Sequence, residues 1–392
     1  MPRRNAPPRI IPSAHADLAV CGSRASYDRA VRDAGDAVAF GEKMLSVLDR
    51  GSFTSTYKYA VLLGLLDLAL EATQRGGAPP TSVTTAQLAS RVIELYWPHV
   101  REFPATARVL QQNLPQRGKS GTPEIVRRIA EFRAAHPAPG TPHRARTAAP
   151  AAWARLAREV EWKLVEMPLP RLQRVGDAPL PFLYAIGWHE GTRKSEFNGP
   201  DFDNSIRFLP GAGEQLVRLS GLLRPLIQRE WAALIARFNR LPEATLEEFL
   251  FSSDRVALGA LREPLRELQR GECFYCERSL RATSVEVDHF VPWSRHPNDA
   301  IENLVAAHAS CNGSKSDHLA ASAHVSRWVR RDADAAAEVA QIASELAWPS
   351  APELSLGVAR GIYLRLPDDA RLWRGRGEFE VVGRAKLVGL LG

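Results

Sequence analysis

The chain has 392 residues, of which 45% are hydrophobic and 24% are charged, an ordinary balance for a soluble globular protein with about two to four domains. It contains neither a run of eighteen apolar residues nor an apolar N-terminal leader, so we expect a cytoplasmic protein that does not span a membrane. Four cysteines in a chain of this length do not suggest a disulfide framework. The formal net charge of +7 permits a polyanionic partner but does not establish one.

Taken in order, the expected elements describe a mainly α, multidomain protein with a small α+β middle region. A partly disordered N-terminus leads to a helical N-terminal domain, a linker and the middle domain. A module rich in cysteine and histidine follows, and then a mostly helical C-terminal extension. The ranges that we assign to these six parts are, in order, 1–35, 36–136, 137–150, 151–261, 262–320 and 321–392.

Helical periodicity dominates the N-terminal domain. Residues 37–48 and 54–73 predict two helices, of which the second is strongly apolar and therefore buried. Residues 84–97 predict a third helix with a threonine cap. A fourth helix is expected to begin with Thr122 as its cap and Pro123 at its first helical position. Its expected core-facing side chains are Ile125, Ile129 and Phe132.

Positive charge gathers in one part of the chain. Residues 101–158 hold eleven Lys and Arg against three Asp and Glu, whereas residues 262–320 hold seven against nine. We therefore expect most of the Lys and Arg side chains that bind a phosphate backbone to lie in the first segment, on the helix after Pro123 and in the proline-rich linker. The candidate nucleic-acid-binding residues there are Arg117, Lys119, Arg127, Arg128, Arg144 and Arg146. The alternative is a basic face that is only solvated, with the polyanion held by the tail arginines Arg374 and Arg376.

The middle domain and the C-terminal extension carry shorter signals. Residues 151–166 predict a helix, and residues 180–188 and 205–209 predict two strands that pair in a small sheet. Residues 213–238 predict a long amphipathic helix that is kinked at Pro225. The remaining helices that we expect are 246–251, 257–269, 324–329 and 333–346, and residues 372–382 are ambiguous between strand and loop.

Two pairs of potential metal ligands stand at matched spacing within residues 262–320. Cys273 and Cys276 form one pair with two residues between them, and His308 and Cys311 repeat that spacing. Three thiolates and one imidazole are a standard tetrahedral set for zinc, so we predict a structural Zn²⁺ on these four residues. The alternative is that His308 faces solvent and that the cysteines are small buried residues.

Harder ligands lie close to these pairs in the sequence. Asp288 and Asn312 offer oxygen atoms that suit Mg²⁺ or Mn²⁺ better than zinc. His289 has the acid–base range to deprotonate a water molecule aimed at a phosphodiester. We expect Asn303 to hold the backbone that orients His289, and Lys315 to meet a phosphate from the helix face that it shares with Asn312. Since neighbours on a regular strand point to opposite faces, the strand should end or bulge at Asp288-His289.

Together these residues resemble the HNH, or ββα-metal, nuclease family in its zinc-stapled form, over residues 262–320. The resemblance implies Asp288 and Asn312 as ligands of a catalytic divalent cation, His289 as the general base and Asn303 as the central asparagine. Asn312 stands where the motif often ends in histidine, and His308 stands where many relatives have a zinc cysteine. The expected fold class of the whole chain is therefore mainly α, with an α+β middle region and a zinc-stapled ββα-metal HNH nuclease domain.

This resemblance implies a metal-dependent endonuclease that hydrolyses phosphodiester bonds in DNA. It also suggests a role in prokaryotic anti-phage defence or restriction, with other defence-system proteins as partners. Two alternatives stay open at this point: an HNH nuclease that cleaves RNA, and a zinc-dependent scaffold that binds nucleic acid without cutting it.

Overall fold

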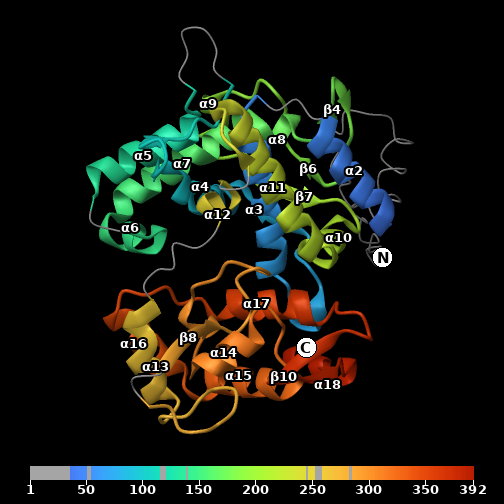
Figure 1. Ribbon diagram of the computed structural model, residues 1–392. Helices are drawn as coiled ribbons and strands as arrows, with labels where there is room; N and C mark the ends of the chain where they lie inside the picture. Colours follow the sequence, from blue (N-terminus) through green and yellow to red (C-terminus); the bar gives the residue numbers. More distant parts are fainter. Residues whose placement is uncertain are drawn as a thin grey trace, which may run out of the picture.

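The computed structural model describes residues 36–50, 54–114, 121–137, 140–243, 246–251, 258–281 and 285–392, which form two lobes (Figure 1). The N-terminal lobe ends at residue 251, and the C-terminal lobe begins at residue 258. Helices make up most of the regular structure, so the predicted mainly α fold class is confirmed. The N-terminus predicted to be disordered, residues 1–35, lies outside the described residues. Within the described ranges we find no helix with the length and apolar character needed to cross a membrane.

Helix α3 (Tyr57–Glu71) is the central element of the N-terminal lobe, and nearly all of its side chains are buried, as its apolar sequence predicts. Helix α4 (Thr85–Tyr96) packs against α3 and against α7 (Pro150–Glu166), while α11 (Ser220–Asn239) also contacts α3. The other helices of this lobe are α2 (Ala37–Arg50), η1 (Arg75–Gly77), η2 (Pro98–Val100), α5 (Glu124–Ala135), α6 (Pro142–Ala148), α8 (Pro168–Arg171), α9 (Lys194–Phe197), α10 (Ala212–Arg218) and α12 (Leu246–Phe251).

The starts of α4 and α5 show how closely cap residues fix a helix boundary. Thr84 accepts a hydrogen bond from the Gln87 backbone, and the Gln87 side chain accepts one from the Thr84 backbone, so the predicted threonine cap is confirmed as a capping box. At α5 the expectation was one residue off, because Pro123 has extended backbone angles and is itself the cap residue, without a side-chain bond. The predicted apolar face of α5 is confirmed by burial of Ile125, Ile129 and Phe132.

A three-stranded antiparallel sheet joins distant parts of the N-terminal lobe. Strand β7 (Ser205–Phe208) lies between β1 (Ser82–Thr84) and β6 (Tyr184–Ile186). The pairing of β6 with β7 confirms the two predicted strands, whereas β1 is too short to have left a signal in the sequence. Since β1 comes from the segment 36–136, that segment and residues 151–261 share one sheet and one core. Two short hairpins complete the lobe, β2 (Glu102–Phe103) with β3 (Arg108–Val109), and β4 (Arg174–Val175) with β5 (Ala178–Pro179).

Two other expectations for the N-terminal lobe need correction. The proline-rich segment 137–150 is not irregular throughout, because it contains α6, which is capped by Thr141 and buries Ala145. The long helix expected at 213–238 is two helices, α10 and α11, divided at Leu219. Pro225 lies inside α11, so the break falls six residues before the proline.

The C-terminal lobe is built around an antiparallel hairpin of β8 (Val285–His289) and β9 (Leu304–His308), followed directly by α14 (Ala309–Lys315). The expectation that the first strand ends at Asp288-His289 is confirmed. Residues 372–382, which were ambiguous, form the hairpin of β10 (Arg371–Gly375) and β11 (Glu378–Val381). The remaining elements are η4 (Leu258–Leu261), α13 (Arg262–Leu268), η6 (Ile301–Asn303), α15 (Ser322–Asp334), α16 (Ala336–Glu345), α17 (Pro352–Tyr363) and α18 (Arg384–Leu391).

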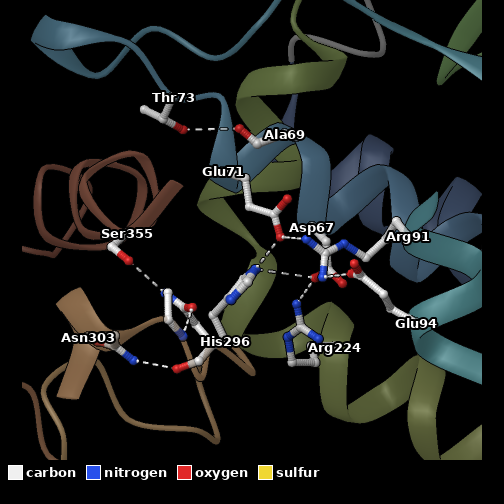
Figure 2. A network of polar contacts seen from close by, with 12 residues as sticks. Asp67, Ala69, Glu71, Thr73, Arg91, Glu94, Arg224, His296, Asn303 and Ser355 are labelled. Carbon is white, nitrogen blue, oxygen red and sulfur yellow. Dashed lines mark hydrogen bonds and ion pairs between the residues drawn. The ribbon is translucent and has the colours of Figure 1, made fainter. Parts of the chain in front are cut away.

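The two lobes meet where α17 packs against α3 (Figure 1). A Cβ atom on Gly357 would overlap the carbonyl oxygen of Glu71, and one on Gly361 would lie 2.8 Å from Leu70 Cδ2. Gly357 therefore needs to be glycine for this close approach to the α3 backbone, whereas a larger residue at Gly361 would have to displace side chains. Polar contacts reinforce the junction, since His296 Nε2 of the C-terminal lobe lies 3.0 Å from Glu71 Oε1 of α3 (Figure 2).

Candidate metal centre and active site

The four predicted zinc ligands converge at one end of the β8–β9 hairpin. His308 closes β9, and Cys311 lies one turn into α14, while the turn from Cys273 to Cys276 approaches from the other side. Their ligand atoms all lie within 4.8 Å of one another, and Cys276 Sγ is 3.3 Å from His308 Nδ1. Glu277 adopts a left-handed backbone (φ 58°), which lets the chain reverse directly after the second cysteine.

The chemistry of these donors fits a zinc ion. His308 Nε2 lies 3.1 Å from the carbonyl oxygen of Ser279, an acceptor, so Nε2 carries the proton and the Nδ1 lone pair faces the sulfur atoms. Burial and the neighbouring sulfurs of Cys273 and Cys276 raise the pKa of Cys311 to about 12. Three thiolates can therefore coexist here only around a cation. The four residues would hold Zn²⁺ as a closed structural site.

The opposite end of the same hairpin carries His289. Its Nε2 atom lies 2.8 Å from Asp299 Oδ1, and its ring centroid lies 5.2 Å from that of Trp293. Because a carboxylate oxygen only accepts, Nε2 is assigned the proton and Nδ1 is left as the basic atom. This pair of a histidine and an orienting carboxylate was not expected from the sequence, since Asp299 lies in an irregular loop ten residues away and has no motif around it.

Asp288, beside His289, is buried and already neutralised by the protein. Its Oδ2 accepts hydrogen bonds from the Tyr275 hydroxyl at 2.5 Å and from the Lys315 ammonium at 2.9 Å. Burial and the charge of Asp288 raise the pKa of Tyr275, which keeps this hydroxyl a donor. Lys315 is fully buried and also donates to the His289 carbonyl oxygen at 2.8 Å. The structure thus places Lys315 inside the site, not on an exposed helix face where we expected it to meet a phosphate.

Asn312 reaches the same strand from α14. Its Nδ2 atom donates to Glu286 Oε2 at 2.8 Å, which leaves its Oδ1 as the acceptor atom. Glu286 and Asp288 are two apart on β8 and therefore share one face of the strand. Among the described residues, only the four zinc ligands form a group of three or more His, Cys, Asp or Glu donors suited to a metal. A second cation on Asp288 and Asn312 would keep several water or substrate ligands, as Mg²⁺ commonly does.

Asn303 fixes the backbone that follows His289. Its Oδ1 accepts from the Val291 amide at 2.8 Å, and its Nδ2 donates to the carbonyl oxygens of Val291 at 3.2 Å and Asn298 at 3.0 Å. The Phe290 amide donates to the Asn303 carbonyl oxygen at 2.7 Å. The residue is 1% exposed, so it contributes through these bonds and not through contact with solvent.

The candidate phosphate-binding arginines fall into two groups. On α5, Arg127 pairs with Glu131 at 2.6 Å, and Arg128 pairs with Glu124 at 3.3 Å and Glu159 at 2.8 Å. On α6, Arg144 and Arg146 are exposed and line a cavity between the lobes. Arg117 and Lys119 lie outside the described residues. Arg374 and Arg376, the alternative pair, are exposed at the β10–β11 hairpin.

Comparison with known proteins agrees with the geometry of the C-terminal lobe. Residues 273–321 match the model of a family described as HNH endonuclease, and this range contains both ends of the β8–β9 hairpin. No curated protein and no solved structure matches the chain. The segment that holds the four zinc ligands together with Asp288, His289, Asn303 and Asn312 therefore resembles HNH endonucleases in their zinc-stapled form.

Proposed function

We propose that this protein is a metal-dependent endonuclease that hydrolyses phosphodiester bonds in DNA. The observation that carries the proposal is a histidine bonded to a carboxylate, His289 with Asp299, at the end of the strand that carries Asp288, which Asn312 of α14 approaches through Glu286. A base and hard metal ligands at adjacent positions are what hydrolysis of a phosphodiester requires. The family match covers all three residues, which supports assigning the same chemistry to them.

In this proposal each residue has a separate task. His289 Nδ1 takes a proton from the attacking water, and the Asp299 carboxylate stabilises the imidazolium that forms. Asn303 holds the backbone after His289 so that the ring keeps its direction. Asp288 and Asn312 would hold Mg²⁺ or Mn²⁺, which supplies charge stabilisation to the phosphate and to the departing oxygen. Lys315 balances the charge of Asp288 inside the protein.

Affinity for the polymer is proposed to come largely from outside the matched segment, because residues 262–320 carry seven basic side chains against nine acidic ones. Each phosphate neutralised by Lys or Arg contributes about −0.9 to the log–log salt slope of binding to duplex DNA. Replacing Arg144 and Arg146 by Ala should flatten that slope by roughly two units. The same change at Arg127 and Arg128 should flatten it less, because both guanidinium groups already pair with glutamates.

Cleavage of purified polymers tests the proposal. Wild-type protein should cut plasmid DNA when Mg²⁺ or Mn²⁺ is added and should not cut when both are omitted, while the His289→Ala variant should be nearly inactive. His189→Ala, which changes an exposed histidine of the N-terminal lobe, is the matched control and should cut at the wild-type rate. Cleavage of RNA alone would reassign the substrate. Binding of nucleic acid without cleavage in either cation would contradict the proposal and favour a scaffold. A role in anti-phage defence rests on the family resemblance.

A further inference from the structure

A cavity of about 480 Å³ lies between the two lobes, close to His289 but apart from the zinc site. One wall belongs to the N-terminal lobe and includes residues of α4, α6 and α11. The facing wall is the loop 293–299, which follows β8 and carries Trp293, His296 and Asp299. Its volume falls within the range of sites that enclose small organic ligands, which is about 300–1,000 Å³.

The charge of the cavity wall is positive. Its lining contains six arginines, Arg91, Arg101, Arg133, Arg144, Arg146 and Arg224, against three acids, Asp67, Glu94 and Asp299. Asp67 pairs with Arg224 and Glu94 pairs with Arg91 at 2.8 Å, so these charges cancel and the rest of the lining holds four arginines against Asp299. An anion is therefore the ligand that this wall favours.

Buried donors without acceptors point the same way. Arg224, 2% exposed, has Nε and Nη1 without a hydrogen-bond acceptor among the described residues, although its Nη2 pairs with Asp67 (Figure 2). The indole N–H of Trp293 is a further donor without an acceptor, whereas His296, 1% exposed, donates Nε2–H to Glu71 and keeps an unbonded acceptor at Nδ1. All three residues line the cavity. A buried N–H without an acceptor is destabilising, and oxygen acceptors of a ligand would satisfy it.

Aromatic rings complete the lining. Trp97, Trp153, Trp293 and Trp348 all contribute to the cavity. Trp293 is the one of these four that is only half-buried, so its face is the natural platform for a planar ring. Arginine groups and a tryptophan face together suit a ligand that joins phosphate to an aromatic base.

We propose that this cavity binds a nucleotide, with its phosphate on the arginines of α6 and on Arg224 and its base against Trp293. The nucleotide could be free or could belong to a nucleic-acid chain, and the chemistry of the wall is the same for both. If the nucleotide belongs to a nucleic-acid chain, this proposal rests on the proposed function. A free nucleotide does not depend on it, because binding needs neither the catalytic cation nor His289.

The position of the loop 293–299 explains why such a site matters to the nuclease. Trp293 packs on the ring of His289, and Asp299 bonds its Nε2 atom. Between them, His296 bonds Glu71 of α3, and Asn298 Nδ2 donates to Ser355 Oγ of α17 at 3.0 Å (Figure 2). A nucleotide in the cavity would thus lie directly against the residues that orient the proposed base.

Calorimetric titration of the full-length, zinc-loaded His289→Ala protein without added Mg²⁺ or Mn²⁺ tests the site without cleavage. The probes are AMP, GMP, CMP and UMP, inorganic phosphate, and a tetranucleotide of single-stranded DNA. We expect saturable binding of a nucleotide probe. Arg146→Gln should weaken it about tenfold or more, the effect of losing one charge-assisted contact, while Arg155→Gln on the exposed face of α7 leaves it unchanged. Trp293→Leu should weaken binding of nucleotides about tenfold but not that of inorganic phosphate.

The two sources give different patterns. Binding of the mononucleotides assigns the site to a free nucleotide, whereas binding of the tetranucleotide alone assigns it to the polymer. Both results support the proposal if Arg146→Gln and Trp293→Leu weaken the binding. Failure of every probe to bind, or equal affinities in wild-type and variant cavities, would overturn it. Plasmid cleavage that persists in that case would show that the proposed function stands while the nucleotide site does not.

Discussion

The two ends of the β8–β9 hairpin solve the same electrostatic problem in opposite ways. At one end, where Val285 pairs with His308, three thiols and an imidazole face one another and need a cation to balance them. At the other end, where His289 pairs with Leu304, Lys315 and Tyr275 already satisfy Asp288. We therefore expect a metal to be part of the fold at the zinc end, whereas at the proposed catalytic end a metal would be an addition to a structure that is complete without it.

The largest expected effect tests the zinc end. Cys311→Ser should lose zinc and unfold the C-terminal lobe, because structural zinc contributes about 10–16 kcal/mol of apparent binding free energy in small zinc modules. Metal analysis and thermal melting measure the two consequences. His308→Cys is the conservative control and should keep both zinc and stability, since zinc accepts either ligand. A Cys311→Ser protein that melts like the wild type would show that this end, too, folds without its metal.

The next effect separates chemistry from folding at the catalytic end. His289→Ala should lower the DNA cleavage rate by roughly two to four orders of magnitude, the usual contribution of a positioned general base. Zinc content and melting temperature should stay at wild-type values, because His289 contributes nothing to the zinc site. If the melting temperature instead fell as far as in Cys311→Ser, the two ends would not be independent.

A smaller effect is expected when the buried ammonium group of Lys315 is removed. Lys315→Met leaves the buried Asp288 carboxylate without its charge partner, which should lower the free energy of unfolding by about 3–5 kcal/mol. Mg²⁺ should restore part of this loss, since a divalent cation at Asp288 would replace the missing charge, whereas wild-type stability should respond little. Chemical denaturation with and without Mg²⁺ measures both.

The double variant Asp288→Asn/Lys315→Met is the control for this experiment. It removes the charge that Mg²⁺ would balance, so its stability should no longer depend on Mg²⁺. Equal Mg²⁺ dependence in the single and double variants would mean that the cation acts elsewhere.

The smallest effect concerns the partner of His289. Asp299→Asn should slow cleavage about ten- to a hundredfold, the effect of losing one charge-assisted hydrogen bond in the transition state. Asp299→Glu keeps a negative charge that can stabilise the imidazolium formed in the transition state, so it should retain more activity than Asp299→Asn. Equal rates for the two variants would mean that Asp299 acts only as a spacer in its loop.

Short-range patterns were the part of this molecule that the sequence could predict. The zinc ligands come in two pairs with two residues between partners, and the strand carrying Asp288 and His289 ends at that pair, shortly before Pro292. Partners that the chain brings together only by folding left no such pattern. Asp299 and Tyr275 are ordinary residues until the loop and the knuckle place them on His289 and Asp288.

Lys315 and α6 show two further reasons why parts of the site could not be predicted from the sequence. Helical spacing put Lys315 near Asn312, but only the packed lobe determines that the amine points inward to Asp288. In the proline-rich segment before α7, the Thr141 cap and the buried Ala145 outweigh the proline content and form a helix. Composition alone therefore placed the arginines of α6 in an irregular segment, although the fold sets them on a cavity wall.

The glycines of α17 have a consequence for how this protein can be engineered. Gly357 and Gly361 let α17 lie against the backbone of α3, the most buried helix of the other lobe. A fragment cut between the lobes would expose that bare helix face, and no ordinary partner surface fits it. The C-terminal lobe therefore cannot be transferred to another protein by itself. A fusion to a new targeting domain would have to include α3, or a helix of similar shape, together with the proposed catalytic residues.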